Sequence, residues 1–251
     1  MQIYKKYNLT RYHNALIKEV AGLDSLRQVL NDSNNTYLNV PQVLGVSEAV
    51  LEMTAIEAQP ASQAQMQGLG VGLAHLHQVR QLFYGLKEDN YIGLNPQINC
   101  LTDNWGMFFV EYRLRYQVSL VNQSSLKKHF QQVLIQHQQK LIDFLNASCE
   151  QASLLHGDLW SGNVLFDQDT VWLIDPAVYF GDREVDLAMT EMFGGFTVDF
   201  YRAYDEIYPR TIAYDQKKVI YNLYHYLNHY NLFGSAYLSA CESGFNALEK
   251  L

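Results

Sequence analysis

The spacing of hydrophobic positions changes along the 251 residues of the chain, from short apolar runs near the start to helical repeats later. Near the start the apolar runs are short, and residues 2–7, 40–46 and 49–53 predict three strands. A helix is expected near residues 15–30, between the first two strands. Residues 55–65 are rich in alanine, glutamine, serine and proline, which is typical of a linker. The pattern therefore predicts a small lobe of strands with one helix.

From residue 66 onward, apolar residues recur at helical spacing in several long stretches. One clear interruption is a predicted β-hairpin, in which residues 164–166 and 171–174 form strands around a polar, acidic turn. This order of elements predicts an α+β fold with two lobes. We expect a small N-terminal lobe over residues 1–56 and a larger, mostly helical C-terminal lobe over residues 57–251.

Composition narrows the class of protein. Apolar residues make up 48% of the chain and charged residues 18%, as in ordinary globular proteins. The formal net charge of -8 argues against a nucleic-acid partner, although it allows a local cationic pocket for a nucleotide. The cysteines are isolated, the N-terminus has no signal-like apolar run, and no apolar stretch is long enough to span a membrane. These features predict a cytoplasmic protein without a membrane partner.

The candidate chemistry surrounds the predicted hairpin. Asp158 is followed five residues later by Asn163, just before the first strand, and Asp175 follows the second strand. Phosphoryl transfer to a hydroxyl needs a carboxylate that orients the acceptor, and oxygen ligands that hold Mg²⁺ against the phosphates. Protein kinases place such residues in this order. Each residue alone could cap a turn or end a strand, but together they predict a catalytic and Mg²⁺-binding site.

The surrounding sequence resembles the fructosamine kinase (ketosamine kinase) family. The resemblance is carried by LLHGDLWSGN at residues 154–163 and by DPAVYFGDREVDLAMTE at residues 175–191. It continues upstream through residues 89–99 and 105–114 and downstream through residues 224–234. It implies a protein-kinase-like fold that uses ATP and Mg²⁺ to phosphorylate a sugar hydroxyl. The implied acceptor is a small-molecule glycated amine or a glycated protein lysine.

Within the catalytic segment, the resemblance implies that Asp158 is the catalytic base and that Asn163 and Asp175 are the Mg²⁺ ligands. It also implies that Asp186 braces the catalytic loop by accepting backbone hydrogen bonds. His156 is expected to hold the loop through a hydrogen bond, with proton transfer as the alternative.

Arg183 belongs to the same segment, and two roles stay open for it. One is a buried ion pair with a nearby carboxylate, and the other is a contact with the substrate.

On the nucleotide side, the family pairs a strand lysine with a helix glutamate. Glu19 matches the glutamate, and the spacing points to Lys6, with adjacent Lys5 as a rival because neighbouring strand residues face opposite sides. The backbone around Glu52 and Met53 would hydrogen-bond adenine, as the hinge does in related kinases.

On the acceptor side, residues 89–99 resemble an insert of the family. Asn90, Gln97 and Asn99 are therefore candidate substrate contacts. The aromatic residues Trp105 and Trp160 are further candidates, and Trp160 distinguishes the catalytic loop from that of generic aminoglycoside kinases.

Two departures from the family pattern change the expectation. Family members begin with two strands and a phosphate-covering loop before the lysine strand, whereas here Met1 lies five residues before Lys6 and the first glycine is Gly22. Without that loop's backbone amides we expect reduced or absent kinase activity, and an exposed strand edge that invites a homodimer. Cys100 stands where relatives often carry tryptophan, which leaves the acceptor specificity open.

Two alternatives stay open at this point. One is another small-molecule kinase of the same fold, of the aminoglycoside, choline or homoserine type. The other is a catalytically silent binding protein with a kinase-like shape.

Overall fold

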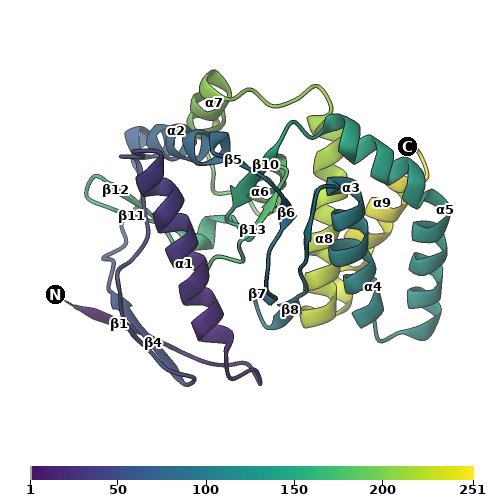
Figure 1. Cartoon of the computed structure of the whole chain (residues 1–251), viewed down its shortest axis with the longest axis horizontal. Helices are drawn as coiled ribbons and strands as arrows, with labels where there is room; N and C mark the ends of the chain where they lie inside the picture. Colours follow the sequence, from purple (N-terminus) through teal and green to yellow (C-terminus); the bar gives the residue numbers. More distant parts are fainter. Residues whose placement is uncertain (1) are drawn as a thin grey trace.

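Residues 2–251 are described by a computed structural model, shown in Figure 1. One end of the molecule is formed by β1 (Ile3–Tyr7), α1 (Ala15–Asp32), β2 (Leu38–Asn39), β3 (Val43–Val46) and β4 (Val50–Thr54). The other helices are α2 (Gln63–Gln78), α3 (Trp105–Phe108), α4 (Tyr116–Leu120), α5 (Ser124–Ser148), α6 (Glu184–Thr190), α7 (Val198–Ile207), α8 (Tyr214–Phe233) and α9 (Leu238–Leu248). The short helical segments are η1 (Phe109–Arg115), η2 (Ser161–Asn163) and η3 (Ser235–Tyr237).

The remaining strands are short, and in Figure 1 most of those that carry a label lie between α1 and α8, with β11 and β12 on the other side of α1. They are β5 (Arg80–Gln81), β6 (Tyr84–Gly85), β7 (Asn90–Ile92), β8 (Asn95–Gln97), β9 (Leu101–Thr102), β10 (Ala152–Leu155), β11 (Val164–Asp167), β12 (Thr170–Leu173) and β13 (Tyr179–Gly181). No helix within residues 2–251 is long and apolar enough to cross a membrane.

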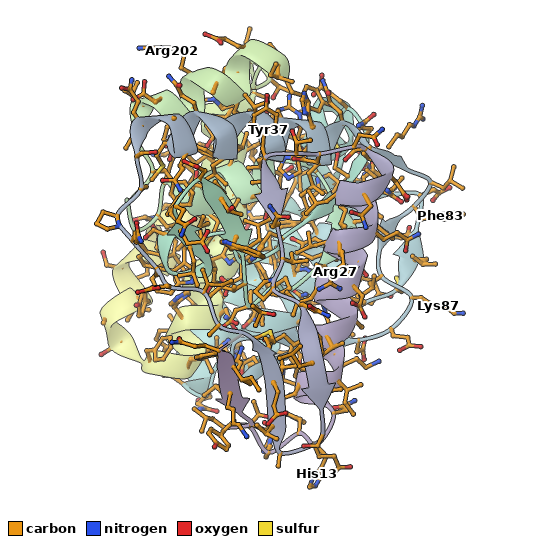
Figure 2. The ribbon with its side chains drawn as sticks, turned by 90° about the vertical axis from the view of Figure 1, so that its left-hand side faces the viewer. His13, Arg27, Tyr37, Phe83, Lys87 and Arg202 are labelled. Atoms are coloured by element: carbon orange, nitrogen blue, oxygen red, sulfur yellow. The ribbon has the colours of Figure 1, made fainter. Side chains whose placement is uncertain are left out.

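The small sheet has the strand order β1-β4-β3, with antiparallel pairing throughout. Helix α1 runs alongside these strands, and Figure 2 looks onto this side of the molecule. Leu23 and Leu26 of α1 are fully buried, and Arg27 donates a hydrogen bond from Nη2 to the carbonyl oxygen of Pro41 at 2.8 Å. The strand predicted over 40–46 starts only at Val43, because Pro41 has no N–H to offer a neighbouring strand.

The predicted linker is shorter than residues 55–65. Ser62 and Gln65 form a reciprocal capping box, which starts α2 at Gln63. The predicted hairpin is confirmed, since β11 and β12 pair antiparallel with Val164 opposite Leu173. Strand β12 also pairs in parallel with β2, which connects the hairpin to the N-terminal part of the chain.

Two clusters of buried apolar side chains form the core. The first joins α3, α5, α8 and α9, and stacks Phe130 on Phe245 with ring centroids 4.1 Å apart. The second contains Leu23 and Leu51 from the small part together with Leu69 and Leu173 from the rest of the chain. The core is therefore continuous across residue 56.

A histidine in α8 makes the fold sensitive to acid. His225 is fully buried, neither of its ring nitrogens has a hydrogen-bond partner among residues 2–251, and burial lowers its pKa to about 3. Below pH 6.5 His225 is protonated in the unfolded chain but stays neutral in the folded chain. The free energy of unfolding therefore falls as the pH falls toward 3. Between pH 6.5 and 5 this loss amounts to about 2 kcal/mol.

We predict that His225→Leu removes this part of the acid sensitivity. Urea unfolding of both proteins from pH 7 to pH 5 measures it as a difference in slope. His13→Leu, at an exposed position at the edge of the molecule, is the matched control (Figure 2). Parallel stability profiles for the native chain and His225→Leu would contradict the prediction.

Candidate active site

The catalytic loop follows β10, a strand in which all four residues are buried. The Asp186 carboxylate accepts hydrogen bonds from the backbone N–H groups of His156 at 2.7 Å and Gly157 at 2.9 Å. Gly157 has φ 81°, and a Cβ atom there would lie 2.1 Å from the carbonyl oxygen of Ala177. Only glycine fits this turn, which brings the loop against the segment after the hairpin.

The His156 side chain also holds the catalytic loop in place, through both of its ring nitrogens. Its Nε2 lies 2.9 Å from the carbonyl oxygen of Ile174, and its Nδ1 accepts a hydrogen bond from the backbone N–H of Asp158 at 3.3 Å. This pattern places the ring proton on Nε2. Burial lowers the pKa of His156, so the ring is neutral and holds the loop through both nitrogens.

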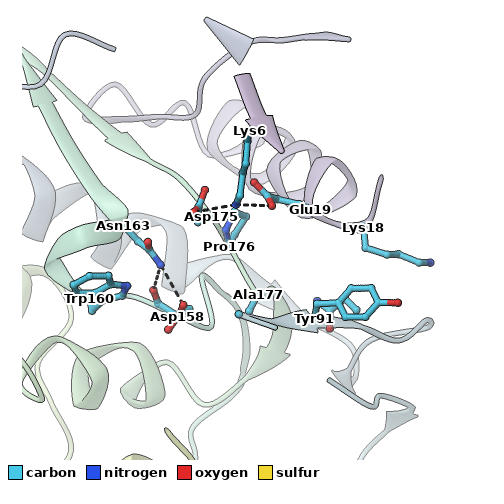
Figure 3. Close-up of a pocket in the computed structure, with 12 residues that line it drawn as sticks. Lys6, Lys18, Glu19, Tyr91, Asp158, Trp160, Asn163, Asp175, Pro176 and Ala177 are labelled. Carbon is cyan, nitrogen blue, oxygen red and sulfur yellow. Dashed lines mark hydrogen bonds and ion pairs between the residues drawn. The ribbon is translucent and has the colours of Figure 1, made fainter. Parts of the chain in front are cut away.

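A cavity of about 260 Å³ opens where the loop, the hairpin and α1 meet (Figure 3). It is lined by Lys6, Lys18, Glu19, Asn90, Tyr91, Gly93, Asp158, Trp160, Asn163, Asp175, Pro176 and Ala177. The three residues predicted around the hairpin are thus brought together with the predicted Lys6 and Glu19.

The lysine beside Glu19 is Lys6. Its Nζ lies 2.7 Å from Glu19 Oε2 and 3.0 Å from Asp175 Oδ2. Lys5 faces the other side of β1 and pairs with Glu52 at 2.6 Å. Burial alone would lower the pKa of Lys6, but the charges of Glu19 and Asp175 outweigh it and raise the pKa, so the ammonium stays charged.

Asp158 lies deep in the cavity beside Asn163. The Asn163 Nδ2 donates to the carbonyl oxygen of Asp158 at 2.8 Å and to its Oδ2 at 3.2 Å. Burial raises the pKa of Asp158 to about 7, the bond from Asn163 opposes this rise, and the charges of Asp175 and Asp186 add to it. A carboxyl group that titrates near neutral pH is suited to accept a proton from an acceptor hydroxyl.

Asp175 and Asn163 fit a hard cation. Asp175 adopts φ 54°, a left-handed conformation that costs a non-glycine residue about 1–3 kcal/mol and that recurs at functional sites. The amide nitrogen of Asn163 is committed to Asp158, which leaves its oxygen as the available ligand. Within residues 2–251 no cluster of three His, Cys, Asp or Glu side chains could hold a metal by itself. Phosphate and water oxygens would have to complete the shell of a Mg²⁺ ion.

The two residues predicted to contact adenine lie within the small sheet. Glu52 and Met53 lie inside β4, the central strand, and pair with β1 on one side and β3 on the other. Their backbone groups therefore bond within the sheet and are not available to a base. The side chain of Met53 instead lines a second cavity of about 270 Å³, which shares Asp175 with the first cavity. The other lining residues are Tyr4, Pro41, Thr54, Ile56, Leu165 and Ile174.

Two of the predicted acceptor contacts are in the protein interior. Trp105 is 1% exposed and donates from Nε1 to the hydroxyl of Tyr221 at 3.0 Å. Gln97 is also 1% exposed and donates to the carbonyl oxygen of Ala177 at 3.0 Å. Neither lines the cavity, because apolar packing and buried hydrogen bonds hold both side chains in the interior, and their contact with substrate stays a prediction.

Asn90 and Asn99 belong to a hydrogen-bond network in the wall of the cavity. Asn90 lines the cavity, and its Oδ1 accepts hydrogen bonds from both Gln97 and Asn99 at 2.9 Å. Asn99 in turn accepts a bond from Arg113, which stacks on Tyr179 at 3.9 Å. This network fixes the cavity wall. Trp160 does line the cavity and is 39% exposed.

Arg183 makes an ion pair. Its Nη2 lies 2.8 Å from Glu150 Oε2, its guanidinium stacks 3.6 Å from the ring centre of Tyr208, and it is 2% exposed. Arg183 is not among the cavity-lining residues, so the geometry favours the ion pair over a substrate contact.

The sequence analysis missed several lining residues, of which Tyr91 and Lys18 are the most informative. The Tyr91 hydroxyl donates to Asn14 Oδ1 at 2.5 Å, and its ring lies 5.1 Å from that of Tyr12. Lys18 pairs with Glu88. These contacts join the insert to the start of α1. The sequence offered one signal for each residue, since Lys18 directly precedes Glu19 and Tyr91 directly follows Asn90, both of which were predicted site residues.

A model of the fructosamine kinase family matches residues 2–250. The chain belongs to the fructosamine kinase family. This member is 45% identical over 172 residues to a "Probable ketoamine kinase" from Synechocystis, a match that covers 67% of this chain and 57% of that protein. It is 36% identical over 244 residues to one from Vibrio cholerae, covering 93% of this chain and 81% of that protein.

Solved structures agree with this placement. The fructosamine kinase family member superposes on a protein described as a "Putative fructosamine-3-kinase" from Haemophilus somnus 129PT with a TM-score of 0.83 and 28% identity. The match covers 98% of this chain and 82% of that one. It also matches an aminoglycoside phosphotransferase, APH(2")-IIa in complex with gentamicin, with a TM-score of 0.61 and 15% identity, covering 100% of this chain and 85% of that one. The second match supports the kinase-like fold alone.

Proposed function

We propose that the protein is an ATP-dependent kinase that phosphorylates a sugar hydroxyl of a ketosamine, the adduct of a sugar with an amine. The observation that carries the proposal is the meeting of Asp158, Asn163 and Asp175 with the Lys6–Glu19 pair in one cavity. The family match and the relatives named as ketoamine kinases support this acceptor class.

Each residue has a defined part in the transfer. Asp158 orients the sugar hydroxyl and accepts its proton, and Asn163 keeps the Asp158 carboxylate in place. Asn163 and Asp175 would hold Mg²⁺, which when bound neutralises charge on the phosphates. Lys6, fixed by Glu19, would contact the phosphate oxygens as a charged donor.

The second cavity is the proposed adenine site. Its lining is mostly apolar and includes Met53, Ile56 and Leu165. It shares Asp175 with the first cavity, so a base held there would direct its phosphates toward Lys6. We expect the base to meet the backbone after β4 rather than that of Glu52.

The direct test is phosphate transfer from Mg²⁺-ATP to lysine carrying a fructose-derived ketosamine. We expect turnover that depends on the sugar adduct, with none on unmodified lysine. An aminoglycoside, choline and homoserine are the comparison acceptors. Preferred transfer to one of them would overturn the acceptor class, and the absence of both turnover and thermal stabilisation by Mg²⁺-ATP would favour a silent binding protein.

Lys6 and its neighbour give a matched pair of variants. We predict that Lys6→Met lowers kcat/KM for ATP by about 10²–10³-fold, because a charged donor to the phosphates is lost. Lys5→Met removes only a surface ion pair and should change kcat/KM by less than about twofold. Steady-state kinetics at varied ATP compares them, and equal losses in the two variants would refute the assignment of Lys6.

A homodimer through β1 stays a prediction. Among the described strands β1 pairs with β4 alone, so its other edge offers backbone groups to a second chain. Light scattering over a range of protein concentrations tests this, and a monomer at every concentration would contradict it.

A further inference from the structure

A run of aromatic rings begins at the cavity and continues over the surface beside it. We call it the aromatic strip, and it consists of Trp160, Phe193, His229, Phe233 and Tyr237. Ring centroids are separated by 6.2 Å from Trp160 to Phe193, 5.3 Å from Phe193 to His229, and 5.0 Å from His229 to Tyr237. The rings come from the catalytic loop, the segment after α6, the C-terminal end of α8 and η3.

The strip is exposed, yet its rings are held in place. Phe193 is 43% exposed and Phe233 is 64% exposed. The Trp160 ring lies over Gly162, where a Cβ atom would come within 2.3 Å of it, and Phe193 packs against the same ring at an interplanar angle of 76°. His229 Nδ1 lies 2.8 Å from the carbonyl oxygen of His225. Single exposed aromatic residues are common, but a contiguous, ordered group next to a cavity is typical of a binding surface.

Resting on the proposed function, we propose that the aromatic strip binds an aromatic or aliphatic side chain of the acceptor that adjoins the sugar-bearing amine. Trp160 lines the same cavity as Asp158, so an acceptor whose hydroxyl reaches Asp158 also lies beside the first ring of the strip. The amine-bearing part of the acceptor can then continue along the strip.

The size and chemistry of the strip define the ligand. A peptide in extended form advances about 3.3 Å per residue, so three ring-to-ring steps match a segment of several residues and exceed a single amino acid. The strip contains no acidic or basic side chain other than His229, and burial lowers the pKa of that histidine. Uncharged aromatic faces favour apolar side chains, through stacking and exclusion of water. The ligand class is therefore a peptide-borne ketosamine with apolar flanking residues.

The test uses two peptides, each with one ketosamine-modified lysine, flanked by phenylalanine in one and by glycine in the other. We expect the KM of the phenylalanine peptide to be about three- to tenfold lower, with similar kcat. The double variant Phe233→Ser/Tyr237→Ser should reduce that ratio to near one. Phe83→Ser, an exposed phenylalanine outside the strip, is the matched control and should keep the ratio.

A binding measurement separates this inference from the kinase activity. The unmodified phenylalanine peptide should change the tryptophan fluorescence of the native protein more than that of the double variant. Equal KM values for the two peptides, or equal fluorescence responses, would overturn the strip as an acceptor site while leaving the kinase proposal intact. If the native protein is a dimer and the double variant is a monomer, the inference would also be overturned, because a second copy of the chain would then occupy the strip.

Discussion

Asp158→Asn should lower kcat for phosphate transfer by roughly 10²–10⁴-fold, because the amide cannot accept the proton of the acceptor hydroxyl. The variant keeps the shape of the side chain, and an amide oxygen can still receive the hydrogen bond from Asn163. KM for ATP should therefore change little. A kcat close to that of the native protein would remove Asp158 from the catalytic role.

The same substitution should stabilise the fold. Burial raises the pKa of Asp158 from 3.8 to about 7, so the folded chain holds this proton more tightly than the unfolded chain. The stability that the protonated form contributes is fully present below pH 3.8. It is lost as the pH rises through about 7. Three pKa units correspond to about 4 kcal/mol, which is the upper limit of the gain at pH 8. Asparagine is uncharged, like the protonated carboxyl group, so the variant does not lose this stability as the pH rises.

Chemical denaturation at pH 8 in EDTA measures this gain, since a bound cation would stabilise the carboxylate and hide it. Asp169→Asn, at an exposed position in the hairpin turn, is the control and should leave stability nearly unchanged. A destabilised Asp158→Asn variant at pH 8 would contradict the expectation. The pH profile of kcat/KM offers a second check, because activity should rise as the pH increases toward and through about 7.

The largest loss of stability is expected at Lys217. Its side chain is fully buried, and Nζ lies 2.8 Å from Asp182 Oδ2 and 2.6 Å from Glu184 Oε2. Burial alone would lower the pKa of Lys217, but the two carboxylates outweigh it and raise the pKa. Lys217→Met would leave Asp182 buried without a cation and Glu184 with only Arg183 at 3.8 Å, and should cost about 3–5 kcal/mol.

Lys218→Met tests the adjacent position in the same helix. Lys218 pairs with Glu191 at 2.7 Å but its side chain is 30% exposed, so its loss should cost less than about 1 kcal/mol. Thermal and urea unfolding of the two variants give the comparison. Similar losses in both would show that burial of the Lys217 network does not determine its contribution.

The parts of the site that lie close together in sequence could be predicted from it. Asp158, Asn163 and Asp175 fall within 18 residues and a single hairpin connects them, so local spacing determines their meeting. Which of Lys5 and Lys6 pairs with Glu19 depends on how β1 is oriented relative to α1, and the structure shows that it is Lys6. The pairing of Met53 with strands on both sides could not be predicted, because strand pairing depends on segments that no local pattern specifies.

Burial was the other feature that sequence alone did not give. Gln97 and Trp105 have side chains suited to sugar binding, and only the packing of distant helices places them in the interior. Tyr224 of α8 donates to Gln97 Oε1 at 2.7 Å, and Tyr221 accepts the bond from Trp105. Both partners lie more than 100 positions away in the chain. The early strands and most of the later helices were predictable from periodicity, but these contacts were not.

The contact between Tyr91 and Asn14 has a thermodynamic consequence. Asn14 precedes the helix that carries Glu19, while Tyr91 belongs to the strand pair on the acceptor side of the cavity. A ligand that orders one partner reduces the entropy that the second ligand must still remove. If this contact couples the two sides of the cavity, linkage requires that ATP and the acceptor change each other's affinity by the same factor. Tyr91→Phe should bring that shared factor closer to one.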